Sequence, residues 1–208
     1  MGTAGAIEVA EQELPAGLRV KNREQRRVAL VEAAYALFAE RGYASTTMED
    51  ISARAGLSRR TAFRYFASKE ELVFPERDQR LALMRGLLEP KAGERAFDTV
   101  RRASLALGRE YQADRARSLA QWAVVQSEPA LIGREMQLDR EFELVIEEAF
   151  LREEREGPRG RRRARVRASA IVGAVRATLR EWFETGATAD LVRLGRETFA
   201  ELERGVGA

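Results

Sequence analysis

The chain has 208 residues, with 36 lysine and arginine side chains against 33 aspartate and glutamate, and a formal net charge of +3. It contains no cysteine and no histidine, which excludes disulfide bonds, thiolate and imidazole metal sites, and catalytic mechanisms that need either side chain. Chemistry by carboxylates or lysine remains open, but the sequence has no Gly-rich phosphate loop and no paired acidic motif, so neither an enzyme nor a cofactor is expected.

Residues 1–21 are predicted to form a flexible N-terminal arm, because the segment is rich in small and acidic residues and is punctuated by glycine and proline. Its glutamates stand where a signal peptide would be basic and then apolar, and no apolar run approaches the roughly 18 residues of a membrane-spanning helix. A soluble cytoplasmic protein with no membrane partner is therefore expected. The basic residues Arg19, Lys21 and Arg23 near the end of the arm either enter a DNA minor groove or are simply solvated.

A first helix is predicted from Asn22 to Gly42. Its apolar residues recur at steps of three and four, which places them on one face of the helix: Val28, Val31, Tyr35 and Phe38. Glycine is common just past a helix C-terminus, and Gly42 therefore marks the end of this helix.

Two shorter helices follow and complete a helix-turn-helix unit. Thr47 stands three residues before Asp50 in the arrangement of a capping box, and Gly56 closes this second helix after barely two turns. Ser58 then caps a third helix with the sequence RRTAFRYF. Three short helices with a glycine turn between the second and third are typical of a DNA-binding unit, which we assign to residues 22–68.

The remainder of the chain, residues 69–208, is predicted to be a larger helical domain for effector binding and dimerisation. A fourth helix begins at Lys69 and runs toward Leu88, but Pro75 lacks a backbone donor and predicts a kink or a restart within it. The sequence beyond Pro90 has no strand signal, and its helical segments span residues 97–114, 115–127, 129–155, 161–184 and 189–204. The predicted fold class is all-α, with about nine helices.

The third helix has one cationic face and one apolar face. Arg59, Arg60 and Arg64 project from one side, while Ala62 and Phe66 face inward. A major groove admits one α-helix, and an arginine fork matches the O6 and N7 acceptors of guanine. A solvated helix face would show the same charge pattern, but the short capped helix and the glycine turn before it favour DNA binding.

The run RVALVEAAYALFAERGYASTTMEDISARAGLSRRTAFRYFASKEEL resembles the N-terminal DNA-binding domain of TetR-family transcriptional regulators and covers about a quarter of the chain. The resemblance implies a homodimer that binds double-stranded DNA at a palindromic operator, usually as a repressor. It also implies that a small molecule entering a helical C-terminal domain releases the DNA. The positions expected to contact DNA are Thr47, Ser58, Arg59, Arg60, Thr61, Phe63, Arg64, Tyr65 and Lys69.

Two kinds of DNA contact are implied by the resemblance. Thr47, Tyr65 and Lys69 correspond to phosphate contacts, and the arginines and the threonine of the third helix correspond to base-facing positions. Many members of the family carry tyrosine in place of Phe63, and a small glycine is frequent in place of Arg60. We expect Arg60 to read guanine, while the missing hydroxyl of Phe63 leaves open an apolar contact to a thymine methyl group.

The C-terminal domain carries apolar and aromatic residues that either enclose an effector, with a glutamine as polar group, or form ordinary core: Tyr111, Leu119, Trp122, Gln126, Met136, Phe142, Ile146 and Phe150. More loosely, the chain resembles a subgroup with an acyl-CoA-like ligand-binding domain, akin to mycofactocin-system regulators. That resemblance implies a long-chain acyl-CoA or another apolar or amphipathic effector. The run REGPRGRRRARVR, with seven arginines, either binds a phosphate of such a ligand or is a solvated loop.

The last two predicted helices carry apolar stripes and are joined by the short turn TGATA. The stripe residues either complete the core of the monomer or form half of a four-helix dimer interface: Ile171, Val175, Leu179, Trp182, Leu191, Leu194, Phe199 and Leu202. The spacing of these residues is compatible with both arrangements.

Three functions are compatible with these features. The first is a ligand-responsive DNA-binding regulator, the second an all-helical interaction protein with a vestigial helix-turn-helix, and the third a helical enzyme that uses carboxylates. No pattern in the sequence predicts the buried cluster of carboxylates that the third would need. We favour the regulator, because the cationic helix stands at the position where a helix-turn-helix unit reads DNA.

Overall fold

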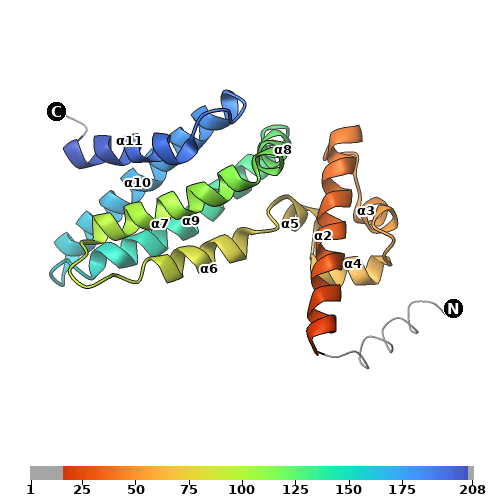
Figure 1. Ribbon diagram of the computed structural model, residues 1–208, viewed down its shortest axis with the longest axis horizontal. Coiled ribbons are helices and arrows are strands. Elements are labelled where there is room, and N and C mark those ends of the chain that lie inside the picture. Colours follow the sequence, from red (N-terminus) through yellow and green to blue (C-terminus); the bar gives the residue numbers. More distant parts are fainter. Residues whose placement is uncertain (1–15, 206–208) are drawn as a thin grey trace. The chain divides into compact units, whose positions relative to one another are not determined.

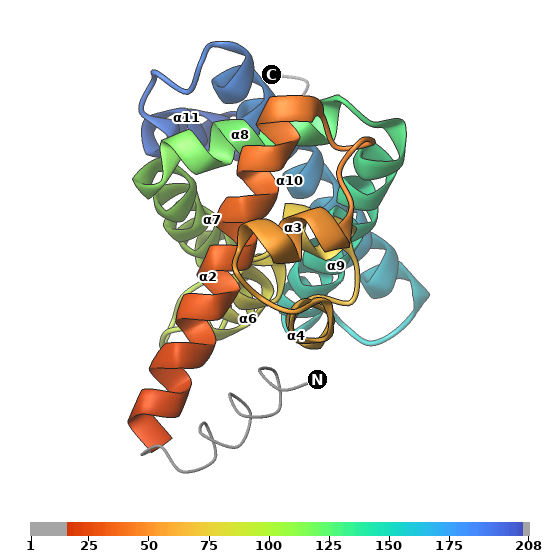
Figure 2. The same ribbon diagram turned by 90° about the vertical axis from the view of Figure 1, so that its right-hand side faces the viewer.

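The computed structural model describes residues 16–205, and these residues form ten helices and no strand (Figure 1 and Figure 2). The predicted all-α fold class is confirmed. The helices are α2 (Ala16–Arg41), α3 (Met48–Arg54), α4 (Arg59–Tyr65), α5 (Lys69–Val73), α6 (Arg77–Leu87), α7 (Ala96–Ala113), α8 (Arg115–Gln126), α9 (Pro129–Leu151), α10 (Pro158–Glu184) and α11 (Leu191–Arg204). None of these ten helices is long and apolar enough to cross a lipid bilayer.

The chain divides into two compact units, which we call unit 1 and unit 2. Unit 1 holds the described residues up to Pro75 together with residues 124–128. Unit 2 holds residues 76–123 and the described residues from 129 onward. Unit 1 therefore contains the predicted helix-turn-helix, and unit 2 contains most of the predicted effector domain.

The boundary after Pro75 falls later than the sequence suggested, since α5 belongs to unit 1. Leu72 and Val73 of α5 are fully buried. The hydroxyl group of Tyr35 on α2 donates a hydrogen bond to the Val73 carbonyl oxygen at 2.9 Å. These contacts make α5 part of unit 1 and not the first turn of unit 2.

Pro75 interrupts the fourth predicted helix instead of kinking it. α5 ends at Val73 and α6 begins at Arg77. Proline has no backbone donor, and its ring clashes with the preceding helical turn, so the helix restarts beyond it. The side chain of Arg27 donates a hydrogen bond to the Pro75 carbonyl oxygen. This restart accounts for the additional helix among the described residues.

The first helix of the structure, α2, begins earlier than predicted. Residues 16–21 are helical and do not belong to an arm, whereas residues 1–15 lie outside the described residues. The sequence LRVKNREQRR after Gly17 contains only residues of good or moderate helix propensity, which explains the earlier start. Val28 is 36% exposed, and the buried face of α2 consists of Leu30, Val31, Ala33, Ala34, Leu37 and Phe38.

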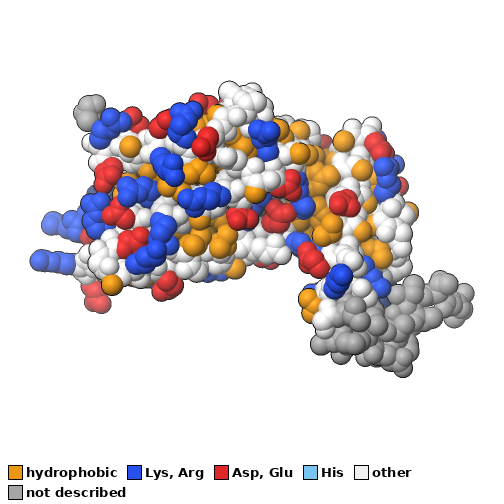
Figure 3. All heavy atoms as spheres, viewed as in Figure 1, with side chains coloured by type: hydrophobic (Ala, Val, Ile, Leu, Met, Phe, Trp, Pro, Cys, Tyr) orange, Lys and Arg blue, Asp and Glu red, His pale blue; other side chains and the backbone are white. Residues whose placement is uncertain are grey.

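Unit 2 is built around one main hydrophobic cluster, to which α6, α7, α9, α10 and α11 contribute buried residues. A second cluster surrounds Trp182, whose indole N–H donates to the Ala189 carbonyl oxygen at 2.9 Å. On the face drawn in Figure 3, basic and acidic side chains are interspersed over this unit. Some of them form ion pairs between helices, such as Arg176 of α10 with Asp139 of α9 at 2.7 Å.

Candidate nucleic-acid interface

Local hydrogen bonds fix both ends of α3. At its N-terminus Thr47 Oγ1 accepts the Asp50 N–H at 3.2 Å, and the Asp50 carboxylate accepts the Thr47 N–H at 2.9 Å, which is the predicted capping box. At the other end Gly56 has a φ angle of +68°, and the Leu57 N–H donates to the Ser52 carbonyl oxygen at 2.9 Å. Glycine adopts this left-handed conformation without steric cost, and the turn sets the direction in which α4 begins.

A side-chain cap also begins α4. Ser58 Oγ accepts the Thr61 N–H at 3.1 Å and lies 2.8 Å from the Thr61 hydroxyl oxygen. Ala62 and Phe66 are buried, as the sequence predicted. The guanidinium group of Arg27 lies 5.6 Å from the centre of the Phe66 ring. The buried residues and the N-terminal cap therefore fix the orientation of α4, and with it the position of its exposed face.

The exposed face of α4 carries two arginines, Arg60 and Arg64. Arg60 is exposed and makes no hydrogen bond or ion pair within the part of the chain that the structure describes. Arg64 is exposed, with its guanidinium 5.6 Å from the centre of the Tyr65 ring. Two guanidinium groups one helical turn apart thus face solvent from one short helix.

Arg59 is also exposed, but it is held by two neighbours. Its Nε atom lies 2.7 Å from Glu49 Oε1 on α3, and its guanidinium lies 5.4 Å from the centre of the Phe63 ring. The Phe63 side chain is 40% exposed, which is unusual for a large apolar group and suits a contact surface. Sequence reasoning missed Glu49, because no helical spacing relates it to a residue on the next helix.

The ammonium group of the half-buried Lys69 is engaged by backbone carbonyl oxygens. Its Nζ atom donates to the carbonyl oxygens of Tyr43 at 2.7 Å and Thr46 at 2.8 Å, and it lies 4.1 Å from the centre of the Tyr43 ring. Burial lowers the pKa of this ammonium group below the usual lysine value. The structure therefore gives Lys69 the role of holding the turn between α2 and α3, and it does not bring the ammonium to the exposed face of α4.

Thr47 is exposed, but its hydroxyl group is engaged locally. The hydroxyl donates to an Asp50 carboxylate oxygen at 2.5 Å, and Arg41 pairs with the same carboxylate at 2.6 Å. The hydrogen bonds from Thr47, and then the charge of Arg41, lower the pKa of Asp50. Of the basic residues expected beside a minor groove, Lys21 and Arg23 are exposed, and the side chain of Arg19 lies outside the described part.

The residues expected to line an effector cavity fall into three groups. Members of the main cluster of unit 2 are Phe142, Ile146 and Phe150. Members packed around Trp182 and Phe183 are Tyr111, Leu119 and Trp122. The exposed members are Gln126 and Met136. The first two groups thus pack in or against the hydrophobic clusters of unit 2, and an effector cavity lined by these residues stays a prediction.

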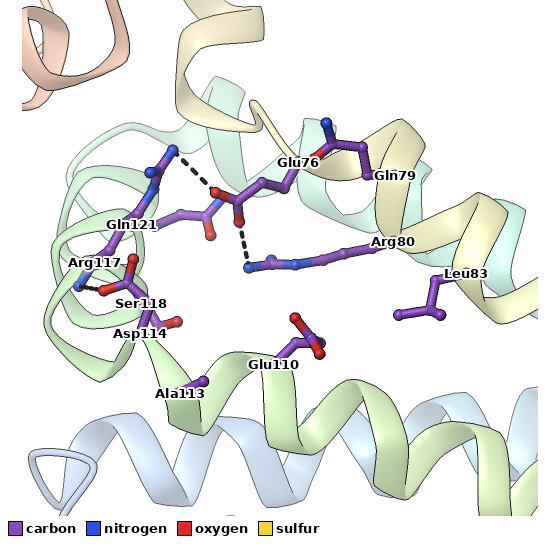
Figure 4. A pocket seen from close by; sticks show the side chains of 10 residues that line it. All are labelled: Glu76, Gln79, Arg80, Leu83, Glu110, Ala113, Asp114, Arg117, Ser118 and Gln121. Carbon is purple, nitrogen blue, oxygen red and sulfur yellow. Dashed lines mark hydrogen bonds and ion pairs between the residues drawn. The ribbon is translucent and has the colours of Figure 1, made fainter. Parts of the chain in front are cut away.

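Unit 2 has a polar pocket between α6, α7 and α8, with a volume of about 330 Å³ (Figure 4). The carboxylate of Glu76 pairs with Arg80 at 2.8 Å and with Arg117 at 3.0 Å, so it links α6 to α8. The Arg80 guanidinium also lies 4.1 Å from the centre of the Tyr111 ring. Apolar periodicity in the sequence could not predict this pocket, because its lining residues are mostly polar or charged and come from three separate helices.

The apolar stripes of the last two helices lie inside unit 2. Four of the eight stripe residues are buried within the chain: Ile171, Trp182, Leu191 and Phe199. The other four are half-buried against the same two clusters: Val175, Leu179, Leu194 and Leu202. The stripes thus complete the core of the monomer, which is one of the two alternatives that their spacing left open.

The arginine-rich run is divided between paired and unpaired side chains. Arg163 and Arg167 pair with Glu154 at 2.6 and 2.9 Å, and Arg165 lies 3.5 Å from Glu147. The other four are exposed and have no ion pair among the described residues: Arg155, Arg159, Arg161 and Arg162. Part of the run therefore ties α10 to the end of α9, and part is solvated.

Comparison with known proteins identifies the DNA-binding unit. The family described as bacterial regulatory proteins of the tetR family matches residues 30–74, which include α3, α4 and α5. The chain is 40% identical over 58 residues to MftR of Mycobacterium tuberculosis (strain ATCC 25618 / H37Rv), a protein named for the transcriptional regulation of mycofactocin biosynthesis. This match covers 28% of the chain and 29% of MftR.

Two further comparisons extend into the helical remainder. The chain is 32% identical over 134 residues to the HTH-type transcriptional regulator TcmR of Streptomyces glaucescens, and the match covers 61% of the chain and 59% of TcmR. Its fold is similar to that of the transcriptional regulator FadR from Bacillus subtilis in complex with stearoyl-CoA, with a TM-score of 0.65 and 20% identity. That superposition covers 86% of this chain and 98% of FadR, and at this identity the likeness concerns the fold alone.

Proposed function

Because residues 30–74 match the tetR family of bacterial regulatory proteins, we propose that the chain is a member of this family and a ligand-responsive transcriptional repressor. The observation that carries the proposal is the exposed face of α4. It presents Arg60 and Arg64 to solvent from a helix that is capped by Ser58 and anchored by Phe66. A capped and anchored helix with exposed arginine side chains matches the width and the acceptor pattern of a DNA major groove.

The proposal includes two copies of the chain on one operator in the cytoplasm of a bacterium, with no catalytic role. A dimer with a two-fold axis would bind a palindrome whose half-sites lie about 34 to 36 Å apart, or a multiple of that distance. The side chains proposed to contact bases are Arg59, Arg60, Thr61, Phe63 and Arg64. Phosphate contacts are proposed for Thr47, Ser58 and Tyr65, which lie on the same three-helix unit.

Ligand control is proposed to act through two of the segments in which the chain passes between its units. One is the Pro75–Glu76 connection before α6, and the other is α8, whose last residues cluster with unit 1. A small molecule that favours one arrangement of α6 and α8 would alter the separation of the two α4 helices of a dimer and thereby weaken simultaneous docking. A long-chain acyl-CoA, which the looser resemblance implied, would need space among side chains that the structure packs into the core.

The proposed function is tested by fluorescence anisotropy with a labelled duplex from the region upstream of the gene for this chain. Binding is expected to exceed that of an unrelated duplex of equal length, and log affinity is expected to fall linearly with log salt concentration. Arg162→Ala, which removes an exposed arginine of α10, is expected to leave the affinity unchanged. Equal affinity for both duplexes at moderate salt would contradict the repressor and favour the interaction module.

A further inference from the structure

We propose that the polar pocket between α6, α7 and α8 binds a small cationic ligand with amine or guanidinium groups. That this ligand is the effector rests on the proposed function, whereas the binding itself does not. The pocket volume of about 330 Å³ is near the lower end of the range of about 300 to 1,000 Å³ for small-molecule sites. The site therefore has room for a small polar molecule and not for a long acyl chain.

The charges of the lining favour a cation. Three carboxylates, of Glu76, Glu110 and Asp114, face the pocket with the two guanidinium groups of Arg80 and Arg117, which leaves one net negative charge (Figure 4). Both guanidinium groups already pair with the single carboxylate of Glu76. The carboxylate of Glu110 has no hydrogen bond or ion pair within the described ranges. Glu110 is exposed, so its carboxylate is hydrated and accessible to a cation that enters the pocket.

The position of Glu110 on its helix also favours a cation. It lies in the last turn of α7, a turn that contains no basic residue. The C-terminal end of a helix carries a partial negative charge, so a carboxylate is unfavourable there and a cation is favourable. Asp114, four residues further on, is explained by its local role, because its Oδ1 atom accepts the Arg117 N–H at 3.3 Å. Glu110 and Asp114 are both exposed, and a bound cation between these two carboxylates would relieve their repulsion.

Neutral groups of the pocket match the same ligand chemistry. The buried Ser118 hydroxyl donates to the Tyr111 carbonyl oxygen at 3.1 Å, so toward a ligand its oxygen offers acceptor capacity. The Arg80 guanidinium over the Tyr111 ring shows that this corner already stabilises a cation between an aromatic face and a carboxylate. A ligand with several N–H donors would find acceptors in the Ser118 hydroxyl oxygen and in the carboxylates of the pocket.

A cation in this pocket would compete for the ion pairs of Glu76, the residue at which the chain enters unit 2 after Pro75. Glu76 is the first residue of unit 2 after Pro75, and its carboxylate joins Arg80 of α6 to Arg117 of α8. A ligand that competes for this carboxylate weakens the link between α6 and α8, the two helices through which the proposed control passes. Ligand binding is therefore expected to lower operator affinity.

The test is isothermal titration calorimetry of the full chain with agmatine and with spermidine as cationic probes. At least one probe is expected to bind saturably with one site per chain, and Glu110→Gln is expected to weaken this binding by about ten-fold, because a charge-assisted hydrogen bond is lost. The matched control is Glu148→Gln, which changes the net charge equally at an exposed position of α9 outside the pocket. It is expected to bind the probe as the original chain does.

Three outcomes would overturn the inference: no saturable binding of either probe below about 1 mM, equal weakening in both variants, or binding of lauroyl-CoA in their place. Circular dichroism establishes that each variant is folded, and Glu110→Ala serves as a second variant if Glu110→Gln is not. A chain that binds the probe but no DNA sequence specifically would contradict the proposed function and leave the pocket assignment standing. Specific DNA binding without probe binding would contradict the pocket assignment and leave the proposed function standing.

Discussion

Arg60 is the residue that distinguishes base reading from general attraction to DNA most clearly. It is exposed on the first turn of α4 and has no partner in the described part of the chain, so its guanidinium is free to reach a base edge. Arg60→Ala is expected to cost about 1 to 3 kcal/mol of binding free energy at one half-site position and to relax the base preference there. Anisotropy titrations against operators with single base changes measure both effects. An equal loss on every operator would instead identify a phosphate contact.

Lys69 is expected to matter for the stability of unit 1. Lys69→Met keeps most of the apolar stem but removes the donors that serve the Tyr43 and Thr46 carbonyl oxygens. Carbonyl groups left without partners are expected to lower the free energy of unfolding by about 1 to 3 kcal/mol, measured by urea denaturation followed by circular dichroism. Lys91→Met, at an exposed lysine, is the matched control. Unchanged stability together with weaker DNA binding would show that Lys69 contacts phosphate after all.

At the scale of the elements, the connection between α6 and α7 contains a bidentate ion pair between Arg102 and Glu94. Its contribution to the stability of the fold is expected to decrease at acidic pH. Arg102 donates to the two carboxylate oxygens of Glu94 at 2.9 and 2.8 Å, and the Lys91 N–H donates at 3.2 Å. These hydrogen bonds, led by those of Arg102, lower the pKa of Glu94 to about 2. A carboxyl group whose pKa is depressed by folding stabilises the fold above its unfolded pKa and loses that contribution as the pH falls toward the folded value.

Glu94→Gln is therefore expected to flatten the acid dependence of stability between the ordinary glutamate pKa of 4.5 and about pH 2. Urea unfolding midpoints over this range, compared with those at neutral pH, provide the measurement. Glu148→Gln, at an exposed position of α9, should keep the original slope. A slope that is identical in all three proteins would show that the ion pair does not couple to folding.

The break between α5 and α6 is expected to take part in ligand control. Pro75→Ala restores a backbone donor and permits the two helices to join, while it keeps the carbonyl oxygen that Arg27 contacts. We expect operator affinity, or its response to agmatine, to change by about five-fold or more, as measured by anisotropy. If neither quantity changes, Pro75 has no mechanical role.

Local signals in the sequence predicted the elements well. The capping residues Thr47 and Ser58 each accept a backbone N–H at the start of α3 and α4, and the helix restarts after Pro75. These features depend on residues within one or two turns of each other, which sequence spacing describes directly. The all-α fold followed from the same signals, because each amphipathic segment needs only its own periodicity to be recognised.

Contacts between distant segments could not be predicted in this way. The Lys69 ammonium reaches carbonyl groups more than twenty residues earlier, and Arg59 meets Glu49 only because the turn at Gly56 sets the angle between two helices. The polar pocket of unit 2 shows the same limit. Apolar residues at helical spacing went into the core, while the pocket is lined by polar groups whose proximity depends on how three helices pack.

At the scale of the whole molecule, the chain combines a helix-turn-helix unit, proposed to bind DNA, with a helical unit that has a polar pocket. Half of the stripe residues of α10 and α11 are buried within the chain, and a dimer interface that involves the half-buried members stays a prediction. In a dimer on one palindrome, a ligand that changes the arrangement of the two units would alter the fit of both α4 helices to the two half-sites. The proposed ligand control would therefore appear as a change in operator affinity.

Selection of bound sequences from a library of random DNA duplexes tests the central claim most directly. The account predicts enrichment of one palindrome whose half-sites are centred about 10 base pairs apart, or a multiple of that spacing, with a guanine whose enrichment disappears for Arg60→Ala. Retention of duplexes without any enriched sequence, at a salt concentration where the chain still binds DNA, would contradict it.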